Sequence, residues 1–163
     1  MYKKSVELIQ SLRECDPYLG LIMRNKQTAA LIAAVFALLT LSACSTRPPA
    51  DQFGFGPRTS SQSRYTATLE PSDQPLKPRR MLKVQVTIRD AAGQPVDGAT
   101  IDVDGGMPQH GHGLPTKPRV TRSLGEGRYE IDGLRFNMGG WWELHLAVTS
   151  PAGSDRITFN LQV

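Results

Sequence analysis

Two histidines separated by a single glycine form the most distinctive group of potential metal ligands in this chain. His110 and His112 lie in a Gly/Pro-rich stretch over residues 105–115, and Met107 stands shortly before them. Imidazole binds copper in either oxidation state, whereas a thioether prefers the softer Cu(I). Met138, in a second glycine-containing stretch, would add another sulfur. These residue types predict a copper site made by Met107, His110, His112 and Met138.

The same stretch has a second interpretation that needs no metal. A His-Gly-His sequence in a Gly-rich turn can be a solvated loop, with Met107 lying over one end of a β-sandwich, and that end can bind a protein partner. The turn segment 93–99 favours this interpretation, because it resembles the strand-turn-strand segments of adhesive or accessory bacterial domains. Two classes therefore stay open: a copper-handling module, and a structural or protein-interaction domain without metal.

No group of residues predicts catalysis. Asp102 and Asp104 share one face of a predicted strand, which is more typical of a solvated surface than of an acid–base pair. His145 also alternates outward, away from the core. No serine stands in a nucleophile elbow, and no glycine-rich loop opens a predicted helix to hold a phosphate. We therefore expect a protein that is not an enzyme.

The composition excludes several classes of protein. A length of 163 residues allows about one domain, so a multi-domain enzyme and a helical transporter are both excluded. The 19 basic and 15 acidic side chains give a net charge of only +4. No run of Lys and Arg with interleaved aromatic residues is present, so we expect no nucleic-acid partner.

Apolar and polar residues alternate along the second half of the chain with the period of a half-buried strand. This pattern predicts strands at 82–89, 99–104, 119–124, 129–131, 141–148 and 157–163, a short strand at 134–136 and a possible edge strand at 64–70. The glycines and prolines of residues 105–115 predict a loop. About seven short strands with regular turns predict an all-β protein, an immunoglobulin-like antiparallel β-sandwich. A small closed barrel is the alternative.

Two adjacent tryptophans lie in one of these predicted strands. Trp142 alternates with Leu144, Leu146 and Val148 and is expected in the core. Trp141 falls on the opposite face, so we expect it on the surface.

Several motifs follow one another in the second half of the chain. They are Met107-Pro108-x-His110-Gly111-His112-Gly113, Gly127-x-Tyr129 and Gly133-Leu134-x-Phe136-x-Met138-x-Gly140-x-Trp142. In this order they resemble the YtkA-like domain, an exported bacterial β-sandwich family close to FixH-like domains, over about residues 80–163. The family pattern usually reads Phe-His-Met-Pro-Gly-x-Trp in the last motif, and Asn137 and Gly139 depart from it here. The resemblance implies a fold and an exported setting more than an activity.

The N-terminal part of the chain is typical of a bacterial lipoprotein precursor. Residues 29–41 are almost wholly apolar and follow two basic residues, but they are too few for a permanent membrane helix, which needs about 20. Leu41-Ser42-Ala43-Cys44 then resembles the lipoprotein box, whose cysteine receives the lipid. We expect a signal peptide at 23–43 and a lipid on Cys44 that attaches the domain to a membrane of the cell envelope, facing the periplasm.

Three further segments complete the expected organisation. Residues 1–22 are predicted to be an extension from a mis-called start codon, with Met23 as the true start. Residues 44–78 are rich in Ser, Pro and Gln and predict a flexible tether that includes the possible edge strand. Residues 79–163 are expected to form the sandwich domain, with an envelope protein as a possible partner.

Overall fold

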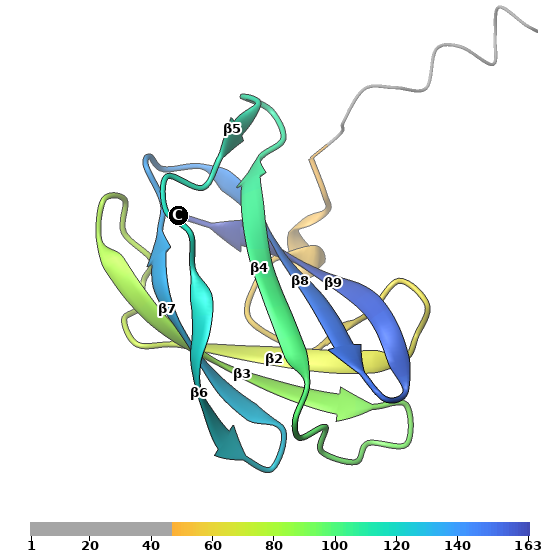
Figure 1. Ribbon diagram of the computed structural model, residues 1–163. Coiled ribbons are helices and arrows are strands. Elements are labelled where there is room, and N and C mark those ends of the chain that lie inside the picture. The colour runs from red at the N-terminus through yellow and green to blue at the C-terminus, as the bar shows by residue number, and fades with distance from the viewer. Residues whose placement is uncertain (1–46) are drawn as a thin grey trace, which may run out of the picture. The chain divides into compact units, whose positions relative to one another are not determined.

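A computed structural model describes residues 47–163 of the chain (Figure 1). The expectations for residues 1–22, for the signal peptide at 23–43 and for lipidation at Cys44 fall outside the described residues. Within residues 47–163, no helix is long and apolar enough to cross a bilayer.

Short strands dominate the described chain, as the alternating pattern predicts. One short 3-10 helix precedes nine strands, of which β1 and β5 have two residues each, so seven strands are longer. The elements are η1 (Ala50–Gln52), β1 (Arg58–Thr59), β2 (Tyr65–Pro71), β3 (Met81–Asp90), β4 (Thr100–Met107), β5 (His112–Gly113), β6 (Arg119–Gly125), β7 (Arg128–Arg135), β8 (Trp141–Ser150) and β9 (Gly153–Gln162). The prediction of an all-β protein is confirmed.

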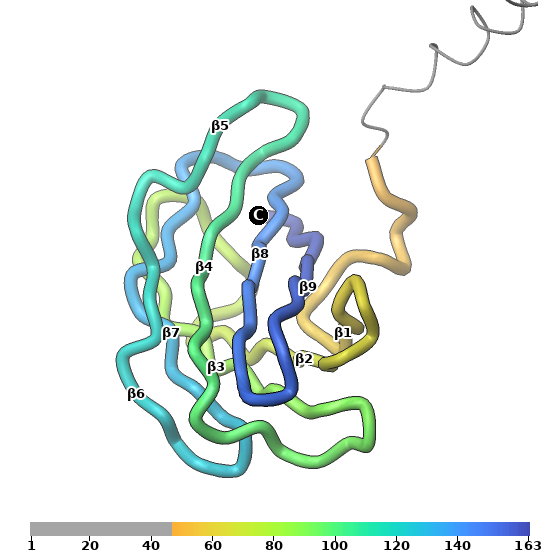
Figure 2. Tube along the Cα trace, turned by 45° about the vertical axis from the view of Figure 1, so that its right-hand side comes forward, coloured from red at the N-terminus to blue at the C-terminus, as the bar shows by residue number. Residues whose placement is uncertain are grey.

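The strands form one antiparallel sheet in the order β1-β2-β3-β7-β6-β4-β8-β9, with β5 paired to β4. The sheet folds over on itself and nearly closes, because the segment before β2 runs alongside β9 (Figure 2). The backbone N–H of Gly54 donates to the carbonyl of Asn160 at 3.0 Å, and that of Ser61 donates to the carbonyl of Arg156 at 2.9 Å. The architecture is therefore sandwich-like, and its near closure also resembles the small closed barrel that the sequence leaves as an alternative.

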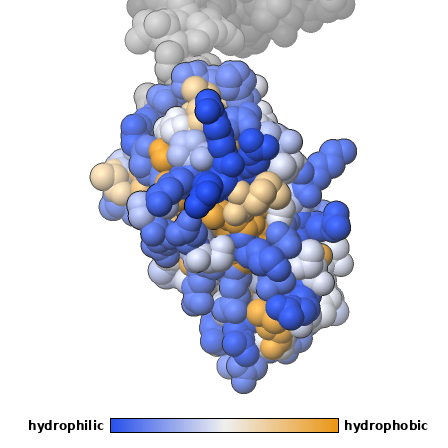
Figure 3. All heavy atoms as spheres, turned by 90° about the vertical axis from the view of Figure 1, so that its left-hand side faces the viewer, coloured by the Kyte–Doolittle hydropathy of each residue, from blue (hydrophilic) through white to orange (hydrophobic). Residues whose placement is uncertain are grey.

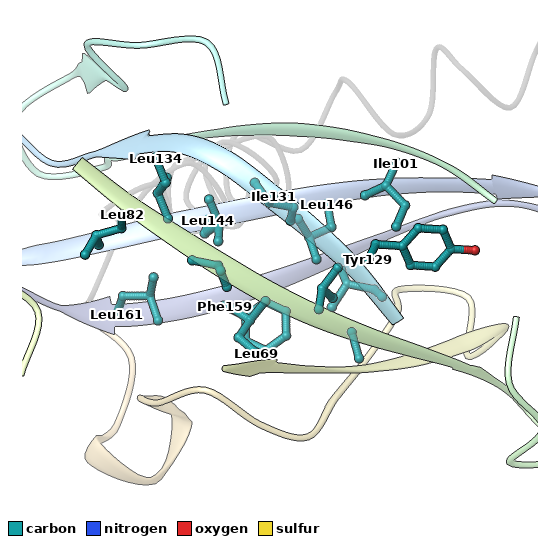
Figure 4. Close-up of a cluster of buried hydrophobic side chains, with 14 of the residues drawn as sticks. Leu69, Leu82, Ile101, Tyr129, Ile131, Leu134, Leu144, Leu146, Phe159 and Leu161 are labelled. Carbon is teal, nitrogen blue, oxygen red and sulfur yellow. The ribbon is translucent and has the colours of Figure 1, made fainter. Parts of the chain in front are cut away.

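The core lies between the two halves of the folded sheet. Side chains from β2, β3 and β7 point toward those from β4, β8 and β9 (Figure 4). Every second residue of β3 is buried, and the same period buries Leu144, Leu146 and Val148 on β8. Trp142 is fully buried and its ring meets that of Phe136 edge-on at 5.2 Å. The inward register expected for Trp142 is thus confirmed.

Several predicted strands differ from the structure in extent or in place; β9, for example, begins at Gly153 and not at residue 157. The short strands expected at 129–131 and 134–136 form the single strand β7. The possible edge strand at 64–70 forms β2, which lies between β1 and β3 and buries Tyr65, Ala67 and Leu69 in the core.

The prediction that Trp141 lies on the surface is wrong, because its side chain is only 3% exposed. The ring of Phe53 packs edge-on against the indole at 6.5 Å, with the planes at 64°. Phe53 belongs to the segment that precedes β1 and covers the outer face of β8 and β9. Strand alternation does place Trp141 opposite the core, but a distant part of the chain buries that face as well.

Residues 47–63, for which the composition predicts a flexible tether, carry η1 and β1 and lie against the sandwich. Their turn into β2 is held by Asp155 of β9, which is only 7% exposed. One carboxylate oxygen of Asp155 accepts a hydrogen bond from the Ser61 hydroxyl at 2.9 Å, and the other accepts from the N–H of Gln62 at 3.0 Å. This segment is therefore fixed by specific contacts.

Candidate functional site

The stretch that contains the paired histidines forms a β-hairpin at one end of the sandwich (Figure 1). β4 continues through Gly105 and Gly106 to Met107, and the chain returns as β5, so the loop predicted over 105–115 is in part wrong. The glycines fit the strand because neighbouring backbones approach closely. A Cβ atom on Gly106 would lie 2.6 Å from the carbonyl oxygen of His112, and one on Gly105 would collide with that of Glu143.

Met107 lies in the hydrophobic core and is only 3% exposed. Its terminal methyl group lies against Gly140, where an added Cβ atom would come within 2.9 Å. Its carbonyl oxygen accepts hydrogen bonds from the N–H groups of His110 and Gly111, at 3.1 and 2.9 Å, which close the hairpin turn. Met107 therefore joins the hairpin to the end of the core, at the place that the metal-free interpretation expects.

His110 and His112 are exposed, and their rings lie face to face with centroids 6.1 Å apart and planes at 23°. Within residues 47–163, neither ring makes a side-chain hydrogen bond with another residue. The structure thus brings the two predicted imidazole donors together on the exposed hairpin.

Met138 lies in the connection between β7 and β8 and is 40% exposed. Its carbonyl oxygen accepts a 3.0 Å hydrogen bond from the indole N–H of Trp142, which fixes the backbone of this connection. The contact between Met107 and Gly140 brings the connection next to the hairpin. All four predicted donors therefore belong to one end of the sandwich, although Met107 is turned into the core.

An open hollow with a volume of about 330 Å³ lies beside the hairpin, over β4 and β8. His112 from the hairpin, Asp104 from β4, and Glu143 and His145 from β8 contribute to its lining. Gly105 and Gly106 of β4 and Gly113 of β5 also line the hollow. Within the described residues, no three or more His, Cys, Asp or Glu side chains are arranged to hold a metal ion.

His145 faces this hollow from the outer face of the sheet, and its side chain is 25% exposed. Its Nε2 lies 3.5 Å from Oε2 of Glu143, and its Nδ1 lies 3.1 Å from the hydroxyl oxygen of Thr158. The outward direction expected for His145 is confirmed, but the sequence does not reveal that the residue shares a hollow with His112. The pairing of β4 with β8, which places Asp104 opposite His145, is the information needed to predict that His145 and His112 share the hollow.

Comparison with known proteins gives one match. Residues 59–147, from β1 into β8, match the family model described as YtkA-like, which confirms the resemblance seen in the motifs. No curated protein and no solved structure matches the chain.

Proposed function

The chain belongs to the YtkA-like family, and from this membership and the hairpin geometry we propose an exported accessory domain that binds copper at the β4–β5 hairpin. In this proposal a lipid on Cys44 anchors the protein to a membrane of the cell envelope, with the domain facing the periplasm. The protein handles the ion without catalysing a reaction.

The observation that carries the copper proposal is the pair of exposed, face-to-face imidazole rings of His110 and His112. Exposed side chains change rotamer readily, so both rings can turn a nitrogen toward one ion. The thioether of Met138 is accessible from the neighbouring connection and would complete a donor set suited to Cu(I).

Met107 has a different place in the proposal, because a buried thioether can reach an ion only by leaving the core. We assign Met107 to the support of the hairpin, through its packing in the core and its carbonyl contacts with the turn. The proposed ligand set is therefore His110, His112 and Met138, and the fourth predicted donor holds the hairpin in position.

A second function is favoured by the burial of Met107 and by the lack of a three-ligand His/Cys/Asp/Glu cluster in residues 47–163. In that case the hairpin, which extends from one end of the sandwich, binds a protein partner in the envelope and holds no metal. The double variant His110→Ala/His112→Ala separates the two functions, because it removes both proposed imidazole ligands.

Anaerobic titration of the mature, lipidated protein with Cu(I), against a competing chelator, tests the copper proposal, because this form has no free thiol to compete for the ion. The double variant His110→Ala/His112→Ala should lose binding and keep the wild-type circular dichroism, because both side chains are exposed. His145→Ala is the matched control, since it removes an imidazole from the same end of the molecule but not from the ligand set, and it should retain binding. Equal binding by the wild type and the double variant would overturn the proposal.

A further inference from the structure

We infer that the end of the sandwich where β3 begins lies on the membrane surface, with Met81 among the lipid headgroups and Arg79 and Arg80 facing anionic lipid. This inference rests on the lipid anchor proposed for Cys44 and adds an orientation of the domain on the bilayer. The partner surface is a bilayer that contains anionic phospholipid.

The first observation is that the chain is held on the domain from Arg47 onward. The guanidinium of Arg47 donates a 2.7 Å hydrogen bond to Oε1 of Gln162 and lies 5.0 Å from the centre of the Phe53 ring. Phe53 in turn packs on Trp141 and forms a parallel β-bridge with Asn160. The N-terminal segment therefore reaches the end of β9 and stays in contact with it.

The second observation is the length of chain between this contact and the lipidation site. Only Ser45 and Thr46 stand between Cys44 and Arg47 in the sequence. An extended chain advances at most about 3.6 Å per residue, so these three steps span roughly 11 Å. A lipid on Cys44 would thus keep Arg47 within about that distance of the bilayer surface.

The antiparallel register brings the start of β3 to the same end of the molecule as this contact. Trp141 at the start of β8 pairs with Gln162 at the end of β9, and Met81 at the start of β3 pairs with Arg135 at the end of β7. The short connection from β7 to β8 joins these two pairs. The N–H of Arg79 also donates to the carbonyl of Phe136 within that connection, at 2.7 Å.

The chemistry of this end suits a lipid surface. Met81 is 59% exposed, the highest value for a large hydrophobic residue in the described chain. Lys77, Arg79 and Arg80 are exposed beside it, and none of them forms an ion pair within residues 47–163. Exposed cations next to an apolar side chain are attracted to anionic headgroups, while the apolar group enters the interface.

The surface pattern argues for lipid headgroups over a protein partner. On the face shown in Figure 3, apolar residues form small separate patches among hydrophilic ones. A stable protein interface usually needs a larger continuous apolar area. Contacts of a few cations and one methionine are sufficient for a domain that a covalent lipid already holds at the bilayer.

The test uses the full chain, expressed in a host that lipidates it and reconstituted into vesicles that contain phosphatidylglycerol. In the proposed mature protein the lipid occupies the thiol of Cys44, so Met81→Cys introduces a single site for an environment-sensitive fluorophore. Its emission should shift to shorter wavelength on reconstitution and be quenched by headgroup-labelled lipid. Ala152→Cys, exposed in the turn between β8 and β9 at the other end, is the matched control and should show neither change.

A charge reversal completes the test. Arg79→Glu/Arg80→Glu in the Met81→Cys background should reduce the emission shift, as should vesicles of phosphatidylcholine alone. Intact mass of the protein reports the acyl chains on Cys44. An acylated protein whose label at residue 81 behaves like that at residue 152 would overturn the inferred orientation and leave the anchor intact. A membrane fraction without acylated protein would overturn the anchor itself.

Discussion

The indole N–H of Trp141 donates a 2.9 Å hydrogen bond to the side-chain oxygen of Asn160, across the outer face of β8 and β9. Both side chains are buried. The backbone carbonyl of Asn160 accepts a separate hydrogen bond from the backbone N–H of Gly54. The amide of Asn160 thus satisfies the one polar atom of a large aromatic group, beneath a cover supplied by Phe53. This makes a second buried cluster on the side of the sheet opposite the main core.

Removal of Trp141 should therefore be as damaging as removal of Trp142. Truncating a buried tryptophan to alanine usually costs about 3–5 kcal/mol, and both side chains are almost fully buried. Urea unfolding of Trp141→Ala and Trp142→Ala should give similar losses in the free energy of unfolding. A much smaller loss for Trp141→Ala would show that the cover from Phe53 is absent in solution.

The hydrogen bond of Trp141 can be tested separately through its acceptor. Asn160→Leu keeps a side chain of similar size but leaves the indole N–H without a partner, which should cost about 1–3 kcal/mol. Gln94→Leu is a suitable control, because it changes an exposed amide whose side chain makes no hydrogen bond within residues 47–163. Equal stability of both variants would contradict a role for the hydrogen bond.

Gly127 should tolerate substitution less well than Gly93, although both have positive φ, at +72° and +78°. A Cβ atom on Gly127 would collide with the carbonyl oxygen of Ile88 and lie 3.0 Å from the nitrogen of Val96, whereas one on Gly93 would meet nothing within 4 Å. Gly93→Ala should cost only the left-handed conformation, about 1–2 kcal/mol. Thermal unfolding should show a clearly larger loss for Gly127→Ala, and equal losses would contradict the close approach.

The stability of the fold should depend on the ionisation of Asp155. Burial raises the pKa of this carboxyl, but hydrogen bonds from the hydroxyls of Ser60 and Ser61 and the N–H groups of Arg156 and Arg64 outweigh burial and hold the pKa well below its usual range. A carboxyl group with a lower pKa in the folded state stabilises the fold at pH values above its unfolded pKa. This contribution is lost as the pH falls.

Urea unfolding of the wild type should therefore give a free energy of unfolding that declines as the pH is lowered from about 5 toward 2. Asp155→Asn should be less stable at neutral pH and should show a shallower decline. Asp73→Asn, which changes an exposed carboxylate, is the control and should follow the wild type. Parallel pH profiles for the wild type and Asp155→Asn would argue against the role assigned to Asp155.

Copper binding should respond to the softness of the ligands and to acid. Met138→Leu should weaken Cu(I) binding more than Cu(II) binding, because only the softer ion gains from the thioether. Binding of either ion should weaken as the solution is acidified, since protons compete with the metal for the imidazole nitrogens. Titrations in both redox states measure these effects, and an unchanged preference in Met138→Leu would remove Met138 from the ligand set.

Cys44→Ala should abolish lipid attachment and leave an unprocessed precursor. The reason is that the proposed lipidation joins the acyl groups to this thiol before the signal peptide is removed. Metabolic labelling with a fatty-acid analogue, followed by gel analysis of wild type and variant, measures the effect. An acyl label that persists in Cys44→Ala would place the lipid elsewhere, and its absence from the wild type would refute the lipoprotein proposal.

The alternation of apolar and polar residues is sufficient to predict features that depend only on residues close together in the sequence. Alternation along β3, β8 and β9 predicts their inward faces correctly, and the ordered motifs predict the family. The burial of Trp141 could not be predicted in this way, because its cover comes from Phe53, far away in the sequence.

The hairpin shows a second limit of local pattern. The glycines of residues 105–115 predict a loop, yet Gly105 and Gly106 extend β4, because only glycine allows the close backbone contacts on either side. Likewise, the shared hollow of His112 and His145 depends on the pairing of β4 with β8, and strand order cannot be obtained from alternation.

The segment at residues 53–61 also covers part of the edge of β9. β9 is a ten-residue strand at the end of the sheet order, and such an edge would offer unpaired N–H and C=O groups to any extended chain. The backbone N–H groups of Gly54 and Ser61 donate hydrogen bonds to carbonyl groups of this edge. Phe53 also forms a β-bridge with Asn160 on the same edge. A fragment that begins at β2 would keep most of the core but leave the edge of β9 open as a template for aggregation.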